Sequence, residues 1–107
     1  MPRLRGGRRL KLLWVLCNES IAEEVREVMD SVPMTGYTVW QGVLGTSEAG
    51  GTHWGDAVWP GRNWAFMIAE EEGRSRRLIE LLGALKERPE VRQAGLRVFS
   101  QEVEAVL

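Results

Sequence analysis

The residues best suited to chemistry lie close together in one glycine-rich segment, residues 45–63. This segment holds His53, the only histidine of the chain, together with Asp56 and two tryptophans, Trp54 and Trp59. A long connection without an evident helix or strand pattern is typical of a segment that binds a ligand or a partner. We therefore interpret these four residues as candidate partner-contacting residues. A flexible hairpin whose tryptophans fold back onto the domain is the structural alternative.

Two kinds of reaction site can be considered in this segment. Ser47, His53 and Asp56 are the residue types of a hydrolytic triad, but proximity on a loop does not create the activated geometry, and no nucleophile elbow is present. His53 with Asp56 or Glu48 supplies ligand types for a divalent cation, and symmetry-related copies of the chain can complete such a site. We expect no catalytic residue here, and cation binding stays an alternative.

The glycines of the same segment suggest anion binding. Residues 45–52 differ at one position from the phosphate-binding P-loop pattern, because Gly51 stands where the lysine should be. Without that lysine the segment lacks the charge that holds β- and γ-phosphates, and it joins two expected strands instead of a strand and a helix. Backbone N–H groups at Gly45, Gly50 and Gly51 can still approach an anion, which makes these glycines candidate ligand-binding residues.

A second charged cluster follows the expected third strand. The acidic run 70–72 precedes Arg74, Arg76 and Arg77 at the start of an expected helix. The simpler interpretation is a solvated turn with mutual ion pairs. The functional interpretation is that Arg76 or Arg77 reaches an anion at a subunit boundary, and the sequence leaves both open.

Hydrophobic spacing predicts four strands and two helices to position these residues. The strands are expected at residues 10–17, 37–44, 64–69 and 96–103. Ser20, with Glu23 three residues later, forms a capping box that predicts a helix ending at Pro33. Ser75 is the predicted cap of a second helix, and Pro89 its predicted end.

This β-α-β-β-α-β order predicts an α+β fold, a ferredoxin-like sandwich in which two helices cover one face of a four-stranded antiparallel sheet. The other face is left uncovered. Trp14, Trp40 and Trp64 lie on expected strands, so we expect some large aromatic side chains on that face, where assembly would bury them. We divide the chain into a basic arm, residues 1–9, and one domain, residues 10–107.

Composition restricts the function classes. A chain of 107 residues with 44% hydrophobic residues suits one core. Cys17 is the only cysteine, so it forms no internal disulfide, and with His53 it cannot supply a structural zinc site. We expect it to be a small core residue and not a reactive thiol.

The basic residues are unevenly distributed. Five of the 14 precede residue 12, so the rest of the chain has nine basic residues and 15 acidic ones. Its net charge of −6 disfavours nucleic-acid binding.

The apolar run after Arg9 superficially resembles an export signal. Lys11 interrupts that run, and no small-residue cleavage site follows it. No stretch has the length of apolar residues that a membrane helix needs, so we expect a cytoplasmic protein that does not span a membrane. The glycosylation sequon at Asn18 would then be irrelevant.

The run Trp59-Pro60-Gly61-Arg62-Asn63 resembles the Trp-Pro-Gly-x-Asn signature of a divergent branch of the PII signalling superfamily. The element order, the glycine-rich excursion and the final segment 95–104 agree with it, so that the resemblance covers about residues 10–104. It implies a homotrimer of ferredoxin-like subunits that acts as a regulator and not as an enzyme. It also implies that residues 45–63 correspond to the T-loop, which contacts target proteins and responds to ligands bound between subunits.

The resemblance bears on the ligand as well. Typical PII proteins bind ATP or ADP through a Gly-Asp-Gly-Lys-like segment before the last strand, of which only Gly95 is kept here, followed by Leu96. Adenine nucleotide is therefore expected to bind weakly, if at all, with Arg92 or Arg97 compensating in part. The only tyrosine, Tyr37, lies outside the loop, which argues against control by tyrosine nucleotidylylation. The candidate ligand-binding residues are Gly45, Gly50, Gly51, Arg62, Asn63, Arg92, Gly95 and Arg97.

Three further expectations follow. Members of the divergent branch are associated with heavy-metal efflux systems, so the implied partner is a transporter or another protein. The alternative is a trimeric divalent-cation-binding protein, similar to the cation-tolerance family, with His53 and loop carboxylates as ligands. An enzyme of ferredoxin-like fold would need an apolar pocket with a poised polar group, and the sequence indicates none.

Overall fold

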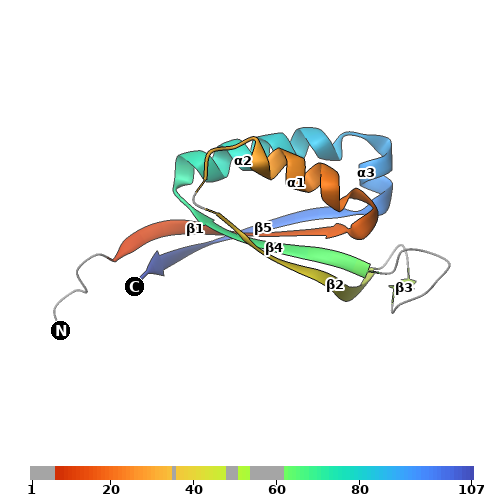
Figure 1. The fold of residues 1–107 in the computed structure, drawn as a ribbon, viewed down its shortest axis with the longest axis horizontal. Coiled ribbons are helices and arrows are strands. Elements are labelled where there is room, and N and C mark those ends of the chain that lie inside the picture. The colour runs from red at the N-terminus through yellow and green to blue at the C-terminus, as the bar shows by residue number, and fades with distance from the viewer. Residues whose placement is uncertain (1–6, 35, 48–50, 54–61) are drawn as a thin grey trace.

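An antiparallel sheet in the order β3-β2-β4-β1-β5 forms one layer of the fold (Figure 1). The computed structural model describes residues 7–34, 36–47, 51–53 and 62–107. Its strands are β1 (Arg8–Asn18), β2 (Thr38–Ser47), β3 (Gly51–His53), β4 (Arg62–Glu70) and β5 (Leu96–Ala105). Its helices are the 3-10 turn η1 (Glu19–Ile21), α1 (Ala22–Asp30), α2 (Glu72–Lys86) and the short α3 (Pro89–Ala94).

The helices lie on one side of the sheet and leave the other side bare (Figure 1). Strands β2, β4, β1 and β5 pair antiparallel, with β1 in the centre between β4 and β5. The predicted α+β ferredoxin-like sandwich, with a four-stranded antiparallel sheet and two main helices on one face, is therefore confirmed. The short helix α3 and the small strand β3 were not expected.

The core lies between the sheet and the helices. Alternate residues of β1 and β4 point toward the helices, so Leu13, Val15, Phe66 and Ile68 are fully buried. They meet Val25 and Met29 of α1 and Leu78 and Leu82 of α2. The ring of Phe66 contacts Tyr37 edge-on, with 5.7 Å between centroids, and Trp64 at 6.1 Å. Phe66 is thus the central aromatic side chain of the core.

Both predicted helix caps are wrong. Strand β1 runs on to Asn18, whose side-chain oxygen accepts a hydrogen bond from the Ser20 backbone N–H, so Asn18 caps η1 and Ser20 lies inside it. Helix α2 begins three residues before Ser75, which is buried within the helix and donates its hydroxyl to the Glu70 carbonyl oxygen at 3.4 Å. In each case a residue nearer the preceding strand already has the extended backbone that an N-cap needs.

Several predicted boundaries also move. Helix α2 ends at Lys86, and Pro89 begins α3, because a proline loses no hydrogen bond in the first turn of a helix. Strand β1 starts at Arg8, two residues early. The predicted excursion 45–63 begins as a hairpin, since β2 extends to Ser47 and pairs with β3 in the register Gly45↔His53.

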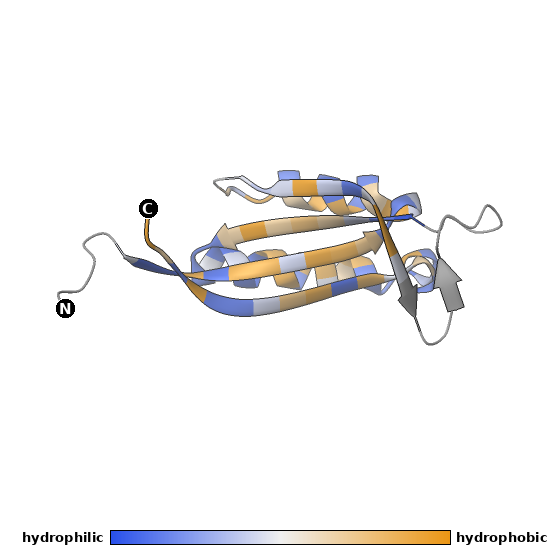
Figure 2. Cartoon of the chain, turned by 90° about the horizontal axis from the view of Figure 1, so that it is seen from below, coloured by the Kyte–Doolittle hydropathy of each residue, from blue (hydrophilic) through white to orange (hydrophobic). Residues whose placement is uncertain are grey.

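Figure 2 shows the sheet from its helix-free side, with many hydrophobic residues along the strands. Strand alternation places Leu10, Leu12, Trp14 and Leu16 of β1 on this face, beside Met67 of β4 and Phe99 of β5. Trp14 stacks on Trp40 with 6.1 Å between ring centroids. Trp40 is 45% exposed and Phe99 53% exposed. The aromatic residues expected on this face are thus present as Trp14 and Trp40, whereas Trp64 packs against the core.

In the described part of the chain, no helix is both long and apolar enough to cross a membrane. The structure places Cys17 in the core at 3% exposure, as predicted. The pKa of its thiol is raised from 9.0 to about 12, first by burial and second by the nearby Glu24, while a hydrogen bond with the Trp64 backbone opposes the rise. The thiol therefore stays protonated and unreactive in the folded state at neutral pH.

Replacing Phe66 by alanine should lower the free energy of unfolding by about 3–5 kcal/mol, because it leaves a cavity in the centre of the core. Urea denaturation measures the change. Ile79→Ala on α2, where the side chain is 40% exposed, is the control and should cost at most about 0.5 kcal/mol. Equal losses in the two variants would contradict the assignment of Phe66 to the core.

The raised pKa of Cys17 also predicts a pH dependence. Between pH 9 and about 12 the thiol ionises only in the unfolded state, so the wild type should lose about 1.4 kcal/mol of stability per pH unit relative to Cys17→Ala. Below pH 9 the difference between the two proteins should be constant. Denaturation curves at pH 8 and pH 10 measure it, and parallel losses in both proteins would show that Cys17 is not buried.

Candidate ligand site at one end of the sheet

The C-terminal end of β1 meets the first residues of β4 and β5. The backbone N–H of Asn18 donates to the Gly95 carbonyl oxygen at 3.1 Å, and Asn18 is the register partner of Asn63. Gly45 of β2 lies so close that a Cβ atom placed on it would be 2.9 Å from Nδ2 of Asn63. The structure thus brings together three of the predicted ligand residues, Gly45, Asn63 and Gly95.

Arg62 begins β4 at the same end of the sheet. Its guanidinium lies over Gly42 of β2, where an added Cβ would be 3.8 Å from Nη1. Gly42 has φ +72° and sits in a break of the β2–β4 register between Trp40 and Val43. Such a bulge bends a strand and redirects its side chains. The bulge therefore leaves room for the Arg62 side chain across β2.

Gly95 connects α3 to β5 with φ +108°, a backbone conformation that side chains disfavour. Its N–H donates to the Val91 carbonyl oxygen at 2.9 Å and closes α3, while its own carbonyl accepts from Asn18. Gly95 therefore has a clear structural role at this position.

The two remaining arginines of the predicted site differ in their surroundings. Arg92 donates from Nη2 to the Glu87 carbonyl oxygen at 3.0 Å, so it ties α3 to the end of α2. Arg97 is exposed on the helix-free face, in register with Leu16 of β1. Within the residues that the structure describes, no ion pair involves Arg97. Of the two, Arg97 is the one available to an anion.

The loop residues are only partly described. His53 and Gly51 lie in β3, opposite Gly45 and Ser47. Gly50 and the predicted partner-contacting residues Trp54, Asp56 and Trp59 lie outside the described residues. Across the described ranges, no three histidine, cysteine or carboxylate side chains form a group that could hold a metal ion.

The charged cluster after β4 consists of local ion pairs. Arg74 pairs with the buried Glu70 at 3.2 Å, and Arg76 pairs with Glu72 at 3.7 Å, each four residues apart on the chain. Glu71 pairs with Arg8 of β1 at 3.1 Å. These contacts agree with the simpler interpretation of a surface turn, and Arg76 already has a partner.

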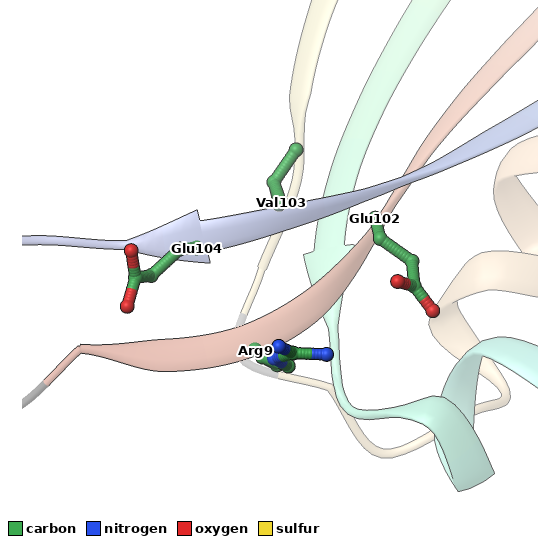
Figure 3. A pocket seen from close by; sticks show the side chains of 4 residues that line it. All are labelled: Arg9, Glu102, Val103 and Glu104. Carbon is green, nitrogen blue, oxygen red and sulfur yellow. The ribbon is translucent and has the colours of Figure 1, made fainter.

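A depression open to solvent lies at the other end of the sheet and is lined by Arg9 of β1 and by Glu102, Val103 and Glu104 of β5 (Figure 3). Arg9 is the register partner of Glu104, and Lys11 pairs with Glu102 at 3.5 Å. The opposite charges there balance one another along the paired strands. The depression contains none of the predicted site residues.

Sequence reasoning missed Asn18, which is 3% exposed and contacts both segments of the candidate site. Its Nδ2 donates to the Arg62 carbonyl oxygen at 3.4 Å, in addition to the bonds to Gly95 and Ser20. The only available signal was an asparagine between an apolar strand and a helix, which is a preferred cap residue.

No protein-family model matches the chain, and no curated protein matches it in sequence. Solved structures do match it in shape. CPII from Thiomonas intermedia K12, a nitrogen regulatory PII-like protein, has in its ADP- and bicarbonate-bound form a TM-score of 0.75 and 17% identity, over 98% of this chain and 95% of CPII. Apo CPII has a TM-score of 0.68 and 16% identity, over 92% of this chain and 94% of that one.

A protein from Thermus thermophilus, described as a putative PII-like signalling protein, has a TM-score of 0.65 and 15% identity, over 94% of this chain and 91% of that chain. These matches extend over nearly the whole sequence, as the predicted resemblance to the PII superfamily implies. The chain therefore has the fold of the PII-like proteins.

Proposed function

We propose that the chain is the subunit of a homotrimeric PII-like regulatory protein. It binds a small anionic ligand between subunits and contacts a partner protein through residues 45–63. The observation that carries the proposal is the combination of a PII-like fold with a sheet face that has no cover of its own. It acts as a regulator and not as an enzyme.

The bare sheet face supports assembly. Trp40 and Phe99 are about half exposed and lie beside Trp14, Met67 and the leucines of β1. Burying one large apolar side chain contributes about 1.5–3 kcal/mol, so an apolar face of this kind favours association. Strand β5 is moreover an edge strand of ten residues, and long edges are normally covered or paired.

Assembly through this face has a consequence for Arg97, which lies on it. A guanidinium that is removed from water by assembly needs a carboxylate, phosphate or similar anion beside it, because burial of an unpaired charge raises the free energy. Gly95 precedes Arg97 by two residues, and Asn18 lies at the end of the neighbouring strand β1. Both lie at the end of the sheet that holds Arg62 and Asn63. An anion at the subunit boundary would satisfy Arg97 and would contact this end of the sheet.

The ligands of the similar structures agree with an anionic ligand. CPII has been solved with ADP, AMP and bicarbonate, and with acetate. Leu96 stands where typical PII proteins have a lysine, so a nucleotide would lack one charge-assisted contact here. We therefore favour a small carboxylate or bicarbonate over a tightly bound nucleotide. By resemblance, the partner is a transporter or another protein.

The test is a calorimetric titration of the protein with ADP, with bicarbonate and with both. We expect bicarbonate binding that Arg97→Ala weakens about tenfold or more, since a hydrogen bond to a charged group contributes about 1.5–3 kcal/mol. ADP alone should bind weakly, with a dissociation constant above the micromolar range.

Arg26→Ala on the exposed surface of α1 is the matched control and should bind like the wild type. Equal affinities in the wild type and Arg97→Ala would remove Arg97 from the site. Binding of a divalent cation alone, with no response to either anion, would support the cation-binding alternative instead.

A further inference from the structure

Asn18 joins the two segments of the candidate site. Strands β4 and β5 do not pair with each other, because β1 lies between them. Their first residues therefore depend on the end of β1 for their relative position. Asn18 is the last residue of β1, and it is almost completely buried, with 3% exposure.

Hydrogen bonds connect Asn18 to both segments of the site and to η1. Its backbone N–H donates to Gly95 at 3.1 Å, on the β5 side, and its side-chain Nδ2 donates to the Arg62 carbonyl oxygen at 3.4 Å, on the β4 side. Its Oδ1 accepts from the Ser20 N–H at 3.0 Å and caps η1. One side chain thus fixes the start of the helical segment and the start of β4 at once.

We propose that Asn18 is a positioning residue for the ligand site, and that its side-chain amide holds Arg62 and Asn63 at a fixed distance from Gly95 and Arg97. The inference rests on the proposed function for its ligand and goes beyond it in assigning a residue that touches no ligand. A positioning residue of this kind needs a donor and an acceptor on separate atoms at the end of one short side chain, and the asparagine amide supplies both.

Substitutions separate the two roles of the side chain. Aspartate and serine cap helices about as well as asparagine, so both keep the acceptor for Ser20. Aspartate has no donor for Arg62 and turns an oxygen toward its carbonyl, and serine is too short to reach it. A capping role alone therefore predicts that Asn18→Asp and Asn18→Ser behave like the wild type. The positioning role predicts that the site changes in both.

The experiment is hydrogen exchange on the full chain, followed by bicarbonate titration of the same samples. In both variants we expect the amides of residues 62–65 and 95–98 to exchange about tenfold faster, while those of α1 exchange at the wild-type rate. Bicarbonate affinity should fall about tenfold. Gln93→Glu, the same change from amide to acid at an exposed position of α3, is the control for the added charge and should leave both readouts unchanged.

Asn18→Ser keeps the test decisive should the buried charge of Asn18→Asp prevent folding. Wild-type exchange at residues 62–65 and 95–98 in folded Asn18→Ser would overturn the inference, whether or not bicarbonate binds. If the wild type binds bicarbonate and Asn18→Ser binds it equally well, the inference fails and the proposed function stands. If the wild type does not bind bicarbonate, the proposed ligand fails, and the exchange rates alone decide the role of Asn18.

Discussion

The central strand β1 must bury both of its faces, and the rest of the structure depends on how it does so. Its run of apolar residues places Leu13 and Val15 under the helices, fully buried. The alternating residues, Trp14 among them, point to the side without helices. A half-buried antiparallel sheet normally has polar residues on its outer face. Here that face is apolar, and this is the reason for proposing that other copies of the chain supply a second layer.

The same strand connects assembly to the candidate site. At its C-terminal end Asn18 contacts the first residues of β4 and the residue before β5. Arg97 lies next to this end on the apolar face, where a neighbouring subunit would cover it. An anion bound there would contact the base of the segment that the resemblance assigns to partner binding. Binding of the ligand would then affect binding of the partner through the strand ends that lie between the two sites.

Sequence reasoning predicted the fold because its signals are local. The apolar run of β1 and the helical spacing of α1 and α2 need no knowledge of their partners. The errors concern features that depend on contacts across the sheet. Ser20 and Ser75 satisfied the rules for caps, but the preceding strands and turns already supplied the capping backbone. The bulge at Gly42 and the hairpin with β3 arise from strand pairing, which spacing within one segment does not reveal.

The candidate site was predictable in part for the same reason. Glycine content and the Trp-Pro-Gly-x-Asn run pointed to Gly45 and Asn63, and the structure places these two residues in contact. Asn18 lies far from them in the sequence, and only the sheet order brings it beside Arg62 and Gly95. A sequence rule that considers one segment at a time identifies Asn18 as a helix cap but does not predict its contact with Arg62.

The measurement that tests this account most directly is the mass of the protein in solution, determined by light scattering at micromolar concentration. If the apolar sheet face is covered by two other copies of the chain, the mass is three times the 12.1 kDa of one chain, 36.3 kDa. A mass of 12.1 kDa would show that the face stays bare, and it would remove the subunit boundary on which the ligand site depends.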